Sequence, residues 1–159
     1  MGQRANTYIK RMTNPFTFKI GMLKMLPSAF FWGFKVEALD EKHCEVSLPY
    51  SWNTKNPFQS IYFAALAGAA ELSTGALCQL AMADRGKFSM LVVDFRAEYT
   101  KKANQKIRFT CQQGEEVANL LDRLKEDQSE RLTMLAVGHN PQGEEVARFF
   151  VTWSFKKKH

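Results

Sequence analysis

The chain has 159 residues, of which 45% are hydrophobic and 24% charged, and its formal net charge is +6. This length fits one domain with one core, and the composition excludes a disordered or low-complexity protein. The positive charge would suit nucleic acid, anionic lipid or a polyphosphate ligand. Because no RNA- or DNA-binding motif accompanies that charge, we expect no nucleic-acid partner.

The cysteines indicate the compartment. Cys44, Cys78 and Cys111 are odd in number, far apart and set in apolar surroundings, without the C-x-x-C spacing of a metal or redox site. We therefore expect buried thiols in a cytoplasmic protein and no metal site.

Near the amino terminus, a broad apolar segment predicts an amphipathic helix over about 14–27. Asn14-Pro15 supplies the start signal, and Pro27 the stop. Lys19, Lys24 and Pro27 interrupt the apolar run, which argues against a signal peptide. Two interpretations stay open: a lid packed on the core, or a helix that touches lipid or an acyl chain, because its polar face carries the two lysines.

The next elements are a hairpin and a long helix. Alternating apolar residues predict strands over 32–38 and 44–48 around a turn at 40–42, and the alanine-rich stretch 62–82 predicts a central helix. This helix is long enough to cross a bilayer. Its Glu71, however, would cost about 2–3 kcal/mol at mid-span, so we expect a buried helix and no transmembrane segment.

The rest of the chain alternates between strands and one short helix. Strands are predicted over 93–100, 106–111, 131–138 and 144–155, a helix over 115–126, and a solvated tail over 156–159. Short turns between consecutive strands imply an antiparallel sheet with the central helix on one face. The prediction is one α+β domain, 1–159, with a core over about 30–155.

Glu71 is the most informative single residue. A lone carboxylate in an apolar helix either has a raised pKa or finds a partner, and perturbed carboxylates are functional-site candidates. The alternative is a structural Glu that is hydrogen-bonded to the backbone or a strand. From the sequence both remain open.

The segment Asn56-Pro-Phe-Gln-Ser-Ile-Tyr-Phe-Ala, which continues without a gap to Glu71, resembles hotdog-fold acyl-CoA thioesterases of the phenylacetate-pathway type. Asn56 matches their loop asparagine, Tyr62 their histidine, Phe63 and Ala64 their two glycines, and Glu71 their catalytic carboxylate. The order of elements agrees from about 30 to 155. Tyr-Phe-Ala in place of His-Gly-Gly indicates a divergent, largely uncharacterised branch.

The resemblance implies a hotdog fold and hydrolysis of an acyl thioester, carried by coenzyme A or a carrier protein, at a cleft in a homodimer or tetramer. Glu71 would be base or nucleophile, the Phe63 or Ala64 N–H an oxyanion donor, and Asn56 a positioning group. Tyr62 would border the substrate. Four basic residues are candidates for binding coenzyme A phosphates, or simply form a solvated face: Arg96, Lys101, Lys102 and Arg108. No cofactor is implied beyond the coenzyme A of the substrate.

Other functions remain in competition with hydrolysis. Acyl dehydration is disfavoured, because His43, His139 and His159 all lie far in sequence from the helix start. A non-catalytic acyl- or lipid-binding domain, in which Tyr62 and Phe63 close the reaction site, is the main alternative. A structural dimer without a ligand is the third.

Overall fold

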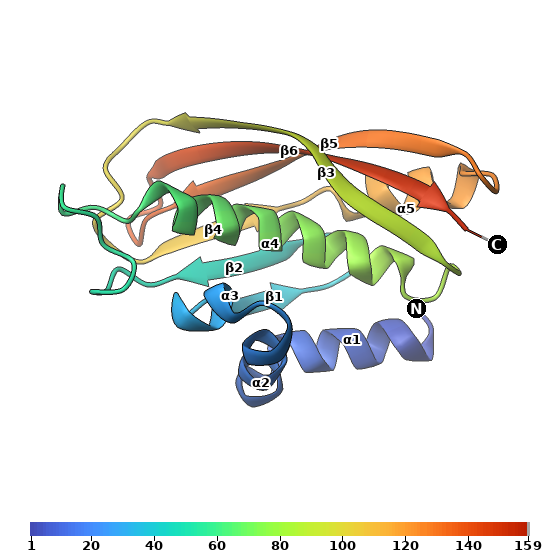
Figure 1. Ribbon diagram of the computed structural model, residues 1–159, viewed down its shortest axis with the longest axis horizontal. Helices are drawn as coiled ribbons and strands as arrows, with labels where there is room; N and C mark the ends of the chain where they lie inside the picture. The colour runs from blue at the N-terminus through green and yellow to red at the C-terminus, as the bar shows by residue number, and fades with distance from the viewer. Residues whose placement is uncertain (159) are drawn as a thin grey trace.

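One antiparallel sheet and one long helix organise the molecule in the computed structural model, which describes residues 1–158 (Figure 1). The strand order is β1-β2-β4-β5-β6-β3. The strands are β1 Lys35–Leu39, β2 Cys44–Leu48, β3 Phe88–Tyr99, β4 Ile107–Cys111, β5 Ser129–His139 and β6 Glu145–Lys157. The sheet curves around α4, Phe63–Met82, so this is the hotdog fold that the sequence predicts.

Helix α4 forms the centre of the core, where it contacts β2, β4, β5 and β6. Thirteen of its twenty residues are buried, and nine of these are small, namely alanine, glycine, serine, threonine or cysteine. Small side chains let the helix backbone lie close to the curved sheet. By length and composition α4 could span a membrane, but 67% of its apolar window is buried inside the protein, as in the core helix of a soluble domain.

The sheet is regular except for bulges and register shifts. In β3 a shift between Val92 and Asp94 places Val92, rather than the predicted Val93, in phase with Phe95, Ala97 and Tyr99. A bulge inserts one residue and turns the following side chains to the other face. Phe95 and Tyr99 both pack on the buried ring of Phe149, at centroid distances of 5.5 and 5.7 Å.

The amino-terminal region differs most from the prediction. Instead of one helix over 14–27 it forms three: α1 Gln3–Thr13, α2 Pro15–Met25 and α3 Pro27–Phe31. They group beside β1 (Figure 1). One side of α2 packs on the core through Phe18 and Met22, as a lid would, and the rest of the helix is exposed.

Helix α1 is absent from the prediction, although Ala5, Tyr8, Ile9 and Met12 follow helical spacing and pack in or on the core. Its cap comes from a residue distant in sequence. The carboxylate of Asp84 accepts hydrogen bonds from the backbone N–H groups of Arg4 and Ala5, both at 3.2 Å. A Cβ atom at Gly2 would lie 2.5 Å from that carboxylate, so glycine is required for the approach. This cap stabilises the helix start in the way a local N-cap residue would.

The other boundaries shift by a few residues. β1 begins at Lys35, three residues later than predicted, because Phe34 and Trp32 pack against Gly68 of α4 instead of extending the strand. The short helix is α5, Gly114–Arg123, and lies against α4. Lys156 and Lys157 belong to β6 rather than to a solvated tail, and His159 lies outside the described residues. The three cysteines are buried and unpaired, as predicted.

Candidate active site

A hollow of about 500 Å³ opens at the amino end of α4. The loop before the helix contributes Asn56 and Tyr62, the helix contributes its first residue, Phe63, and the segment after β3 contributes Lys101 and Lys102. Five residues predicted from the sequence for a substrate site therefore line one hollow, although they come from segments about 40 positions apart. We call it the helix-start pocket.

Asn56 determines the shape of the loop that borders this pocket. Its Oδ1 accepts hydrogen bonds from the backbone N–H groups of Phe58, at 3.0 Å, and Ser60, at 3.2 Å, and from the Ser60 hydroxyl at 3.1 Å. Further along, the Ile61 N–H donates to the Ala103 carbonyl at 2.7 Å. The Asn56 side chain thus holds the loop that delivers the chain into α4, and no contact turns its oxygen toward the pocket.

The first amides of α4 are available for a ligand. Ala65 and Leu66 donate to the Tyr62 carbonyl, but the N–H groups of Phe63 and Ala64 have no acceptor within residues 1–158. A helix start combines such free N–H groups with the positive end of the helix dipole, which favours a negatively charged oxygen. The Tyr62 and Phe63 rings pack edge to face at 4.9 Å beside these amides.

Glu71 lies two turns further along α4 and is half-buried. Burial raises the pKa of its carboxyl group. Its side chain has no hydrogen-bond or ion-pair partner in the described part of the chain, and its Oε1 borders the space beside Gly75 and the Trp153 ring. The structural alternative, a Glu held by hydrogen bonds, therefore finds no support in these contacts.

Gly75 and Trp153 shape the surroundings of this carboxylate. A Cβ atom at Gly75 would lie 3.4 Å from Glu71 Oε1 and 3.2 Å from the Trp153 ring. The indole is fixed because its Nε1 donates to the Thr74 hydroxyl at 2.9 Å. Sequence reasoning missed both residues. The spacing of Glu71 and Gly75, one helical turn apart, was the available signal for Gly75, whereas nothing local pointed to Trp153.

The four basic residues do not gather in one place. Lys101 and Lys102 line the helix-start pocket, where Lys101 also pairs with Glu144. Arg96 lies over the Phe150 ring at 3.8 Å, and Arg108 lies 3.7 Å from Glu45. Their neighbours Phe95 and Phe109 face the core, so both arginines face the outer side of the sheet. Only the two lysines are placed to meet a ligand at the helix start.

Tyr99 is one of several pocket residues that the prediction omitted. It ends β3 on the inward face and lines the helix-start pocket. Partial burial raises the pKa of its hydroxyl group. Its in-phase spacing with Phe95 and Ala97 indicated the inward face, but only the tertiary structure places that end of β3 beside α4.

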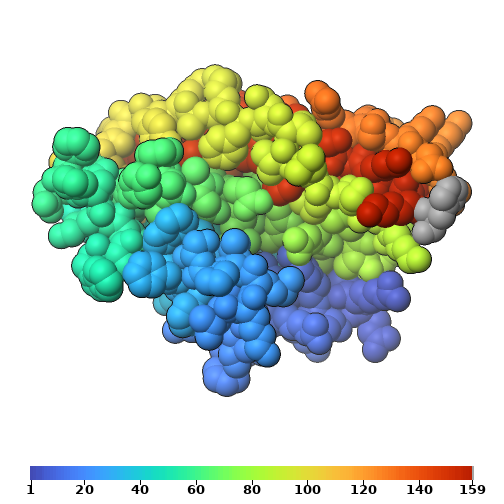
Figure 2. Space-filling model, viewed as in Figure 1, coloured from blue at the N-terminus to red at the C-terminus, as the bar shows by residue number. Residues whose placement is uncertain are grey.

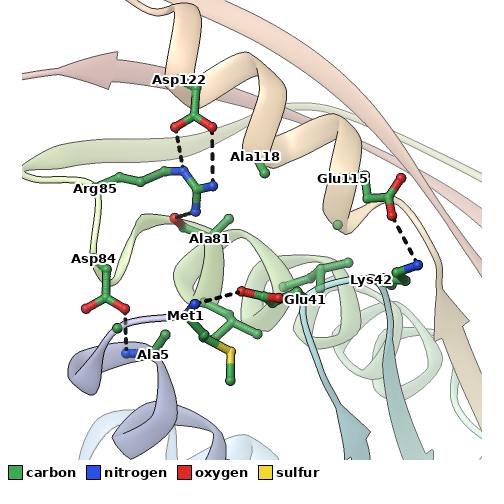
Figure 3. Close-up of a pocket in the computed structure, with 14 residues that line it drawn as sticks. Met1, Ala5, Glu41, Lys42, Ala81, Asp84, Arg85, Glu115, Ala118 and Asp122 are labelled. Atoms are coloured by element: carbon green, nitrogen blue, oxygen red, sulfur yellow. Dashed lines mark hydrogen bonds and ion pairs between the residues drawn. The ribbon is translucent and has the colours of Figure 1, made fainter.

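A second hollow, of about 480 Å³, lies at the other end of α4 (Figure 3). Most of its charged groups are in ion pairs: Arg85 binds Asp122 at 2.7 Å, Lys42 binds Glu115 at 3.4 Å, and the Met1 amino group lies 3.8 Å from Glu41. The carboxylate of Asp84 accepts hydrogen bonds from the first amides of α1. Because these groups are paired, we place the candidate active site at the first half of α4.

Solved structures of the same fold cover almost the whole chain. A Chlorobaculum tepidum protein of unknown function is 19% identical, with a TM-score of 0.75 over 94% of this chain and 99% of its own. A Pseudomonas aeruginosa protein of unknown function, labelled a probable thioesterase, is 20% identical, with a TM-score of 0.74 over 92% and 98%. A Haemophilus influenzae thioesterase is 12% identical, with a TM-score of 0.66 over 86% and 87%.

At these identities the likeness concerns the fold. A sequence comparison with curated proteins finds no match. The model of one family, described as a domain of unknown function, DUF4442, matches residues 16–155. This match runs from α2 to the end of the sheet and includes both the helix-start pocket and Glu71, so the chain belongs to the DUF4442 family.

Proposed function

We propose that this protein hydrolyses an acyl thioester, with coenzyme A as the thiol, at a cleft between two subunits. The observation that carries the proposal is Glu71, an unpaired, half-buried carboxylate in an apolar helix whose start offers two free N–H groups. The fold, which this chain shares with a thioesterase, supports the same reaction class.

Glu71 supplies the basic group. In its ionised form it takes a proton from water while the water oxygen attacks the thioester carbonyl; the carbon–sulfur bond then breaks, and the thiolate leaves and is protonated. Direct attack by the carboxylate, followed by hydrolysis of the anhydride, would give the same products. Because burial raises its pKa, this carboxylate is a stronger base than an exposed glutamate.

The helix start supplies the oxyanion site. The N–H groups of Phe63 and Ala64 would donate to the carbonyl oxygen as negative charge develops there. Asn56 contributes by holding the loop, and Lys101 and Lys102 by attracting the coenzyme A phosphates. Tyr62 and Tyr99 form apolar walls of the pocket.

Within one protomer, the Glu71 carboxylate and the N–H groups of the helix start do not lie close together. Phe63 and Glu71 are eight positions apart, which at 1.5 Å per residue separates them by about 12 Å along the helix. The carboxylate also points toward Gly75, away from the helix start. We therefore propose that Glu71 acts with the helix start of the partner subunit, in a two-fold dimer that joins the free edges of two β3 strands.

The test of this proposal is turnover by Glu71→Gln on short, long and aromatic acyl-CoAs. The amide keeps the shape of the side chain but has no basicity, so we expect turnover to fall by about 100-fold or more. The melting temperature, measured in parallel, should stay level or rise, since an unpaired carboxylate is removed from an apolar site. A folded Glu71→Gln protein with undiminished turnover would contradict the mechanism.

A non-catalytic acyl-binding domain is the second candidate. The observation in its favour is the pair of rings at Tyr62 and Phe63, 4.9 Å apart at the position where the resembling thioesterases have histidine and glycine. Wild-type protein that binds acyl-CoA but hydrolyses none of the panel would establish this function instead.

A further inference from the structure

Large apolar side chains gather on the outside of the amino-terminal helices. The exposed fraction is between 42% and 83% for Phe16, Leu23 and Met25 of α2, for Phe30 and Phe31 of α3, and for Trp52 of the loop between β2 and α4. We call these six residues the α2–α3 surface. A helix that is apolar on all sides is normally buried, and clustered exposed apolar residues mark an interaction site.

This surface is held in a fixed shape. Asn14 caps α2 by accepting hydrogen bonds from the N–H groups of Phe16, at 3.0 Å, and Thr17, at 3.1 Å. The Phe31 and Trp52 rings meet edge to face at 5.9 Å, and the Asn53 amide donates to the Phe31 carbonyl. Figure 2 shows this part of the chain projecting from the body, next to the loop that leads into α4.

Charge is divided unevenly around the same surface. The two segments that build it, 15–31 and 49–62, contain three basic residues and no acidic one. The rest of the chain holds the other nineteen basic residues and all sixteen acidic ones. Within residues 1–158, four of the basic side chains nearest α2 form no ion pair: Lys10, Arg11, Lys19 and Lys24.

We propose that the α2–α3 surface docks on an anionic phospholipid membrane, with its apolar side chains inserted among the lipids and its basic residues at the headgroups. Exposed aromatic and leucine side chains insert at the boundary of the acyl chains, and lysines that flank them are attracted to anionic headgroups. A second copy of the chain fits less well, since a two-fold contact would bring Lys19 and Lys24 of both copies together without any acidic residue to balance them.

The surface lies on the β1 side of the molecule, whereas the proposed dimer uses β3 at the opposite edge of the sheet. Membrane docking therefore leaves the β3 edge free. It goes beyond thioester hydrolysis and does not rest on it, because the binding test requires no turnover.

The experiment measures sedimentation of the full chain with vesicles of phosphatidylcholine alone and of phosphatidylcholine with phosphatidylglycerol. Two double variants alter the surface: Phe16→Ser with Leu23→Ser, and Lys19→Glu with Lys24→Glu. The matched control, Lys125→Glu with Lys158→Glu, makes the same charge change elsewhere. We expect wild type and control to bind the anionic vesicles, each surface variant to bind at least tenfold more weakly, and binding to weaken at high salt.

Circular dichroism melts should show that all four proteins are folded, since every altered side chain is exposed. Equal binding of wild type to both kinds of vesicle, or no binding to either, would overturn the proposal, and so would a control that weakens binding as much as the surface variants do. A lower mass of the Phe16→Ser, Leu23→Ser protein in light scattering without lipid would assign the surface to a second copy instead.

Discussion

The two edges of the sheet differ in what covers them. At one edge, the five-residue strand β1 is flanked by α1 and α2, which pack against it. At the other, the twelve-residue strand β3 pairs with β6 on one side and with no described strand on the other. Proteins normally shorten, cover or charge such an edge, because its free N–H and C=O groups invite another strand.

This difference shows which edge of the sheet the chain covers with its own helices and which edge it leaves unpaired. β3 keeps Leu91 66% exposed and Tyr99 51% exposed on its two faces, and the half-buried Glu71 lies on the helix that the sheet encloses. In the proposed dimer a second subunit would cover these side chains and complete the site at Glu71. The β1 edge is closed by the chain's own helices, whose outer side carries the α2–α3 surface.

The largest expected effect comes from substitutions on β3 that prevent two protomers from pairing at this edge. Leu91→Asp with Val93→Asp places two charges on exposed positions of this strand, so the protomer should fold but fail to pair. We expect light scattering to give 18.2 kDa, the mass of one chain, instead of twice that value. Thioesterase turnover should fall by about 100-fold or more, because neither subunit then completes a site.

The matched control for this pair is Phe16→Asp with Leu23→Asp on α2, at the other edge, where the side chains are 72% and 54% exposed. It should leave both mass and turnover unchanged. If the wild type itself has the mass of one chain over a wide concentration range, the proposed dimer and its shared site are wrong.

A smaller effect is expected from substituting the basic residues. Two of them line the helix-start pocket and two lie on the outer side of the sheet, so the two pairs can be compared. Lys101→Gln with Lys102→Gln should raise the KM for acyl-CoA several-fold and flatten its salt dependence, since both lysines line the helix-start pocket. Arg96→Gln with Arg108→Gln should leave KM unchanged, because these side chains face away from α4. Equal shifts in the two variants would contradict this division.

The smallest effect concerns stability. The pKa of Glu71 is raised in the folded protein, so ionisation opposes folding as pH rises through that value, whereas below the unfolded pKa the group is neutral in both states. Glu71→Gln should therefore melt a few degrees higher than wild type at neutral pH, where 1 kcal/mol corresponds to about 2–4 °C for a chain of this size. At pH values near 4 and below, the two melting curves should converge.

Sequence patterns predicted the sheet, α4 and the position of Glu71, because alternation and helical periodicity are local signals. The prediction omitted α1, although Ala5, Tyr8, Ile9 and Met12 follow helical spacing. It also missed the bulge that puts Val92 in place of Val93, for which the sequence has no local signal. Five candidate residues do line one pocket, but Arg96 and Arg108 do not join them, since strand spacing alone does not tell which face looks toward α4. The position of Trp153 beside Glu71 could not be predicted from the sequence either.

The most direct test of a site shared between subunits is complementation between two inactive variants. Phe63→Pro removes one N–H donor at the first helical position, where proline is well tolerated, and the extended backbone of Tyr62 suits a following proline. Phe63→Ala, which keeps the N–H, is its control. The other partner is Glu71→Gln.

When the Phe63→Pro and Glu71→Gln chains are refolded together, half of the dimers should contain one chain of each kind, and each of these should hold one intact site. We expect the mixture to regain about one quarter of wild-type turnover, as two-fold symmetry requires. A mixture as inactive as its components, with mixed dimers verified by mass spectrometry, would show that Glu71 and the helix start do not act across the interface.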